Sequence, residues 1–90
     1  MGGRWQFPPP DLVLMSLRLP IVDGLKTLYY FRNAYPDIPV VTLVENGLRH
    51  TALLTVEVGA TCAIFKPIDP RQLKRVIYAE LSWTAWGRDE

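Results

Sequence analysis

Three short runs of mostly apolar residues, each followed by a segment with helical spacing, constrain the fold of this chain more than any other feature. The runs are Leu12–Met15, Ile38–Val44 and Thr61–Phe65. Short apolar runs without polar alternation are typical of strands that are buried on both faces. Because consecutive parallel strands are joined by right-handed helical crossovers, the alternation predicts an α/β fold with a parallel sheet.

Helix start and stop signals divide the segments between and after these runs. The spacing of apolar residues predicts a first helix over about residues 23–35 and a second over about 48–58. Gly59 follows the second segment and suits its C-terminal cap. Asp69 is the expected N-cap of a third helix, with Pro70 at the first helical position, where a missing N–H costs little.

The chain has 90 residues, enough for one domain. We expect residues 1–9 to form an extended arm, because Pro8, Pro9 and Pro10 exclude a helix or a central strand there. Residues 10–81 then form the domain and residues 82–90 a C-terminal tail. A domain of this size has a small core, so oligomerisation is an early expectation.

Composition excludes several classes of function. The formal charge is +1 with signs interspersed, which gives no basis for binding nucleic acid or an anionic membrane. One Cys and one His provide neither a disulfide nor a zinc site. The sequence shows neither a signal peptide nor an apolar run of about 20 residues. We therefore expect a cytoplasmic protein without a metal or other cofactor.

Several stretches together carry a resemblance to a known family: Pro10–Pro20 followed by Asp23-Gly24, Ile38–Val41, Val58–Ala60 and Phe65–Ile68. At these stretches, over about residues 10–81, the chain resembles the receiver domain of two-component response regulators. The resemblance implies a three-layer, flavodoxin-like (CheY-like) α/β fold with a parallel sheet of five strands. This chain would supply only the last three strands and the last three helices.

The chain departs from the family at the positions that handle phosphate. The resemblance places Ser16 at the phosphoacceptor aspartate, Val44 at the hydroxyl residue of the next strand, and Ala63 at the aromatic switch residue. Only Lys66 matches the family's site residues. The acidic pair that holds Mg²⁺ should lie upstream of Pro10, where no acid occurs. The resemblance therefore implies neither phosphoryl switching nor a metal site, and we expect no enzyme activity.

An interface with another chain follows from the same comparison. Without the family's first two strands, the strand beginning at Leu12 lies at a sheet edge, and apolar edges invite pairing. We predict a homodimer through this strand, with a separate polypeptide or domain exchange as alternatives. Aromatic residues of the first helix also suit an interface. The candidate interface residues are Phe7, Leu12, Leu14, Leu17, Tyr29 and Tyr30.

The leading hypothesis is a phosphorylation-independent, receiver-like interaction module in two-component signalling or transcriptional regulation. It would form a homodimer or bind another signalling protein. One alternative is a working phosphorelay receiver that uses Ser16 or another non-standard acceptor. Another is a gene fragment without a selected role.

Overall fold

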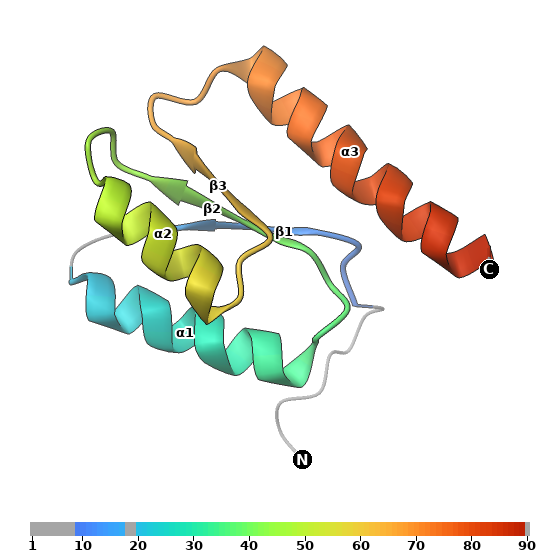
Figure 1. Ribbon diagram of the computed structural model, residues 1–90, viewed down its shortest axis with the longest axis horizontal. Coiled ribbons are helices and arrows are strands. Elements are labelled where there is room, and N and C mark those ends of the chain that lie inside the picture. Colours follow the sequence, from blue (N-terminus) through green and yellow to red (C-terminus); the bar gives the residue numbers. More distant parts are fainter. Residues whose placement is uncertain (1–8, 18–19, 90) are drawn as a thin grey trace.

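The computed structural model describes residues 9–17 and 20–89, with the backbone alone described for 83–89. The elements alternate along the chain, and the three strands form one parallel sheet in the order β1-β2-β3 (Figure 1). The predicted α/β class and parallel sheet are confirmed. The elements are β1 (Val13–Ser16), α1 (Ile21–Ala34), β2 (Val40–Val44), α2 (Arg49–Val58), β3 (Cys62–Phe65) and α3 (Pro70–Asp89).

The predicted helix boundaries hold at some ends and fail at others. Gly59 is the C-cap of α2, and the Asp69 carboxylate accepts a hydrogen bond from the backbone N–H of Arg71 at 2.9 Å. Both predicted caps are thus confirmed. In contrast, α1 begins earlier than expected: Pro20 is its extended N-cap, so Asp23 lies inside the first turn.

Helix α3 continues without a break to Asp89, so it includes most of the segment 82–90 that we expected to form a tail; the boundary of the domain stays a prediction. The tail shows no clear apolar periodicity, which is why the sequence alone did not extend the helix. It also contains no proline, so no residue there is forced out of the helical conformation.

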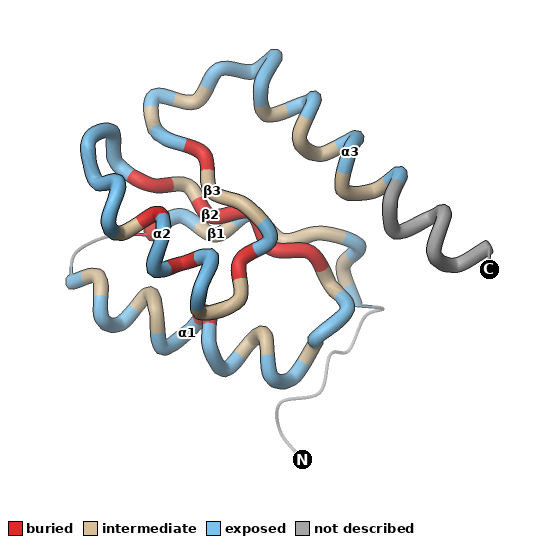
Figure 2. Tube along the Cα trace, viewed as in Figure 1, coloured by how far each residue is buried: buried red, intermediate tan, exposed pale blue. Residues whose placement is uncertain are grey.

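One face of the sheet packs against α1 and α2, which lie side by side (Figure 1). Val40 clusters with Leu28 of α1, and Val44 clusters with Ala52 of α2. These residues are buried, and Figure 2 shows the buried class concentrated on the strands and on the inner side of α2. This layer supplies the hydrophobic core.

Two buried hydroxyl groups fix α2 on this face. The hydroxyls of Thr42 and Thr55 lie 3.0 Å apart and are fully buried. Thr55 also donates to the carbonyl of Ala52 at 2.7 Å. Buried polar groups cost stability unless they are hydrogen-bonded, so this paired arrangement lets a polar residue occupy the middle of β2.

Among the described elements, α3 is the only helix on the other side of the sheet (Figure 1). Val41, Leu43 and Ile64 point to this face because side chains alternate along each strand. The apolar stripe of α3 reaches only intermediate burial, and no residue of α3 up to 82 is fully buried (Figure 2). This stripe consists of Leu73, Val76, Ile77 and Leu81.

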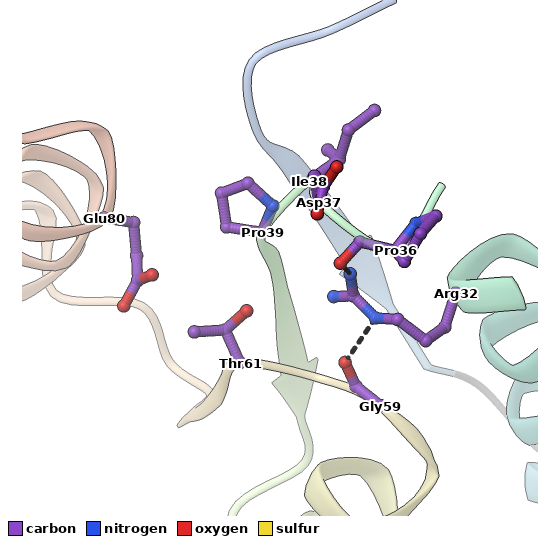
Figure 3. Close-up of a pocket in the computed structure, with 8 residues that line it drawn as sticks. All are labelled: Arg32, Pro36, Asp37, Ile38, Pro39, Gly59, Thr61 and Glu80. Carbon is purple, nitrogen blue, oxygen red and sulfur yellow. Dashed lines mark hydrogen bonds between the residues drawn. The ribbon is translucent and has the colours of Figure 1, made fainter. Parts of the chain in front are cut away.

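A single arginine joins the C-terminal ends of α1 and α2 near the amino ends of β2 and β3. Arg32 Nε donates to the Gly59 carbonyl at 2.9 Å, and Nη1 donates to the carbonyls of Tyr35 and Pro36 at 3.2 and 2.8 Å. Figure 3 shows its side chain lining a recess beside these groups. The guanidinium thereby satisfies carbonyls that helix ends leave without intrahelical partners.

The close contact between Arg32 and the end of α2 requires a glycine at position 59. Its φ of 149° is rarely adopted by other residues, and a Cβ there would lie 2.7 Å from Arg32 Cγ. The backbone of α2 can approach the arginine this closely only because position 59 has no side chain.

We expect Arg32→Gln to lower the free energy of unfolding by about 1 kcal/mol, because the carbonyls of Gly59 and Tyr35, which are partly buried, lose charge-assisted donors. Arg32→Lys should recover only part of this loss, since an ammonium lacks the planar fork. Urea unfolding followed by circular dichroism measures both variants. Equal stability of the three proteins would contradict the assigned role.

Candidate functional site at the carboxyl ends of the strands

Three polar side chains meet at the carboxyl edge of the parallel sheet. Ser16 is the last residue of β1, Glu45 directly follows β2, and Lys66 directly follows β3. Backbone hydrogen bonds between the strands continue just past the ends of β1 and β3 and fix these positions. The Leu17 N–H donates to the Leu43 carbonyl at 3.1 Å, and the Lys66 N–H donates to the Val44 carbonyl at 2.7 Å. Parallel strands bring all three carboxyl ends to one edge, where α/β proteins place their sites.

Lys66 is the centre of this cluster. Its Nζ donates to Ser16 Oγ at 2.8 Å and lies 3.5 Å from Glu45 Oε2, with which it forms an ion pair. The Lys66 side chain is 27% exposed and that of Glu45 63%. An ion pair this exposed stabilises the fold by at most about 1 kcal/mol. Its main effect is that the ammonium group of Lys66 already has a partner within the protein.

Val44 and Ala63, which the resemblance places at two switch positions of the family, lie in or against the hydrophobic core. Val44 is fully buried and packs with Leu17 and Ala52, and Ala63 packs against the same cluster. Neither side chain offers a hydroxyl or an aromatic ring. Their assignment to the family's phosphate-handling positions stays a prediction.

The described residues at this edge do not fit the Mg²⁺ ion that the family's chemistry uses. Mg²⁺ requires several oxygen ligands, mainly carboxylates and water. The cluster contains one carboxylate, that of Glu45, and it is already paired with the ammonium of Lys66. Within the part of the chain that the structure describes, no group of three or more His, Cys, Asp or Glu side chains could hold a metal ion.

Glu45 was missed by the reasoning from sequence. It follows Val44 directly, so its position beside the retained lysine could have been found from the rule that parallel strands end at one edge. Ser16 and Lys66, in contrast, were both singled out, and the structure brings them into contact.

Cys62 does not belong to this cluster. It begins β3 and is only partly buried. Burial, with a smaller contribution from the charge of Glu80, raises the pKa of the Cys62 thiol. The thiol therefore stays protonated and is a weak nucleophile at neutral pH.

The candidate interface residues separate into exposed and buried sets. Leu14 is 42% exposed, and Tyr29 and Tyr30 are 54% and 70% exposed, so these three side chains are accessible. Leu17 is only 2% exposed and lies in the core, so its place among the interface candidates is corrected. Leu17 directly follows β1, and its side chain lies on the same face as that of Met15, toward the layer of α1 and α2, which the sequence pattern did not reveal. Phe7 lies outside the described residues.

β1 lies at the edge of the sheet, since it pairs with β2 alone among the described residues. Leu14 is in register with Val41 and thus points to the face that α3 covers incompletely. An accessible strand edge and an accessible leucine therefore adjoin each other.

Comparison with known families identifies the class of protein. The model of the response regulator receiver domain matches residues 3–78. The chain belongs to this family, and its receiver domain is a signalling module. No helix within the described residues is long and apolar enough to cross a membrane.

The chain is similar to parts of larger regulators. It is 35% identical over 65 residues to the regulatory protein LuxO of Vibrio cholerae, covering 72% of this chain and 14% of LuxO. It is 40% identical over 65 residues to the transcriptional regulatory protein BaeR of Escherichia coli, covering 72% of this chain and 27% of BaeR. The chain thus spans well under two thirds of either relative.

The fold is shared with solved receiver structures. The receiver domain of NtrX from Brucella abortus superposes with a TM-score of 0.74 at 31% identity, covering 81% of this chain and 62% of that chain. This likeness confirms the CheY-like fold that the sequence motifs implied.

Proposed function

We propose that this receiver domain is a phosphorylation-independent interaction module, without enzyme activity, in two-component signalling or transcriptional regulation. We also propose that it acts in the cytoplasm and self-associates as a homodimer. The observation that carries the first proposal is the engagement of Lys66 by Ser16 and Glu45. The protein's own groups occupy the lysine that would otherwise be available to phosphate.

The chemistry at Ser16 supports this proposal. A serine hydroxyl is a weak nucleophile unless an adjacent base removes its proton. Lys66 cannot act as that base in the observed arrangement, because its ammonium group donates to the hydroxyl. An ammonium group has no lone pair with which to accept a proton. Glu45 contacts the lysine and not the serine. The cluster therefore holds the hydroxyl without activating it.

Self-association is supported by the accessible edge of β1. Val13 and Leu17 donate their backbone N–H groups toward β2, to the carbonyls of Pro39 and Leu43. Because the direction alternates along a strand, the N–H groups of Leu14 and Ser16 point to the open side. A second copy of β1, antiparallel across a two-fold axis, would pair with these groups.

The same arrangement would bury apolar surface. A two-fold axis perpendicular to the sheet keeps equivalent faces on one side, so Leu14 of each copy would lie on the face that carries α3. The half-buried stripe of α3 would flank the new contact. Homodimer formation would therefore cover both the strand edge and the incompletely covered face.

We expect a solution mass of about twice 10.3 kDa in light scattering coupled to gel filtration. Leu14→Asp should reduce the mass to that of one chain, because it places a charge in the apolar contact. Leu53→Asp is the matched control: Leu53 is 64% exposed on α2, on the other side of the sheet, and should leave the dimer intact.

A single-chain mass for the unsubstituted protein over the whole concentration range would contradict homodimer formation. Equal effects of the two aspartate substitutions would contradict the assignment of the interface to β1. Circular dichroism of both variants shows whether a loss of mass reflects dissociation or unfolding.

The alternative, a phosphorelay receiver that uses Ser16, makes the opposite prediction about labelling. We expect no gain of a phosphoryl group when the protein is incubated with acetyl phosphate and Mg²⁺ and measured by intact mass. Ser16→Ala provides the background. Labelling of the protein with Ser16, but not of Ser16→Ala, would overturn phosphorylation independence.

A further inference from the structure

A second accessible surface lies on the other layer of the molecule, between α1 and the end of α2. It is a groove of about 240 Å³. Five of its six lining residues are apolar or aromatic, and one is charged. The lining residues are Val22, Leu25, Lys26, Tyr29, Tyr30 and Val58.

This apolar surface is additional to what the core requires. In α1, Leu28 is fully buried in the core, and Ile21 and Phe31 pack against the core from the same helix. Val22, Leu25 and Tyr29 recur at helical spacing and line the groove instead, and Val22 and Tyr29 are each more than half exposed. Val58 also packs against the core, but the exposed side chains of Val22 and Tyr29 are not used by it, so they leave apolar surface that a partner can cover.

The two tyrosines give the groove an aromatic wall. The rings of Tyr29 and Tyr30 contact each other edge to face, with centroids 5.6 Å apart. Such a pair can accept a third ring, since aromatic side chains attract one another in edge-to-face and offset arrangements. The volume is below the roughly 300 Å³ at which drug-sized ligand pockets begin, so it suits one large side chain better than a cofactor.

Lys26 sets the charge of the occupant. It is the one charged residue that lines the groove, and it makes no ion pair or hydrogen bond within the described residues. A carboxylate beside the bound ring would complement it at low cost in desolvation. We propose that this groove binds an aromatic side chain next to an acidic residue in a peptide segment of a partner protein.

This proposal goes beyond self-association, because the groove and the edge of β1 lie on different parts of the molecule. The test uses two probes that share an indole ring. N-acetyl-L-tryptophan carries a carboxylate, and N-acetyl-L-tryptophanamide is neutral. Binding of each is followed in the ¹H–¹⁵N spectrum of the full chain.

We expect saturable shifts at amides of α1 with both probes and about two- to fivefold tighter binding of the carboxylate probe, as for an exposed ion pair. Lys26→Gln should abolish this preference. Tyr29→Ala should weaken both probes by about two- to tenfold, through loss of the aromatic contact. Leu53→Ala, an exposed apolar residue outside the groove, should change neither affinity.

Shifts that do not saturate, or that Tyr29→Ala leaves unchanged, would overturn the proposal. A preference for the carboxylate that survives Lys26→Gln would do the same. If the groove amides shift when the free protein is diluted, the occupant is a second copy of this chain, and the proposed partner is wrong. These outcomes do not depend on Leu14, so they separate the groove from the proposed dimer.

Discussion

The pairing of β2 with β1 on one side and with β3 on the other is the interaction on which the rest of the structure depends. β2 is buried almost throughout, and both of its faces are used: Val40 and Val44 pack under α1 and α2, and Val41 faces the layer of α3. Because all three strands run parallel, their carboxyl ends share one edge. The sheet therefore decides which polar side chains can meet.

At that edge the retained lysine is held by a hydroxyl and a carboxylate of the same chain, while the positions beside it are core residues. The domain has the fold of its family, and we propose that its phosphate-handling positions have changed chemistry. Its remaining accessible features are surfaces: the edge of β1 with Leu14, and the groove beside Tyr29. These surfaces are the basis for proposing that it functions through contacts with other proteins.

The sequence predicted the fold well because short apolar runs and caps are local signals. The strands, the cap at Gly59 and the capping by Asp69 could all be predicted from such signals. Features that depend on three-dimensional neighbours were not. The burial of Leu17 required knowing which face of β1 carries the helices, and the ion pair of Glu45 required the geometry of the strand ends. Helix α3 continues beyond residue 82 although the segment there has no clear apolar periodicity, so this pattern could not predict where the helix ends.

The proposed pairing of β1 can be tested most directly by amide hydrogen exchange at Leu14 and Ser16, whose N–H groups point away from β2. The pairing of two copies predicts that both amides are protected at high protein concentration and lose protection on dilution. Val13 and Leu17, which donate to β2, should stay protected throughout and serve as internal references. Rapid exchange of Leu14 and Ser16 at every concentration, with Val13 and Leu17 protected, would contradict the account.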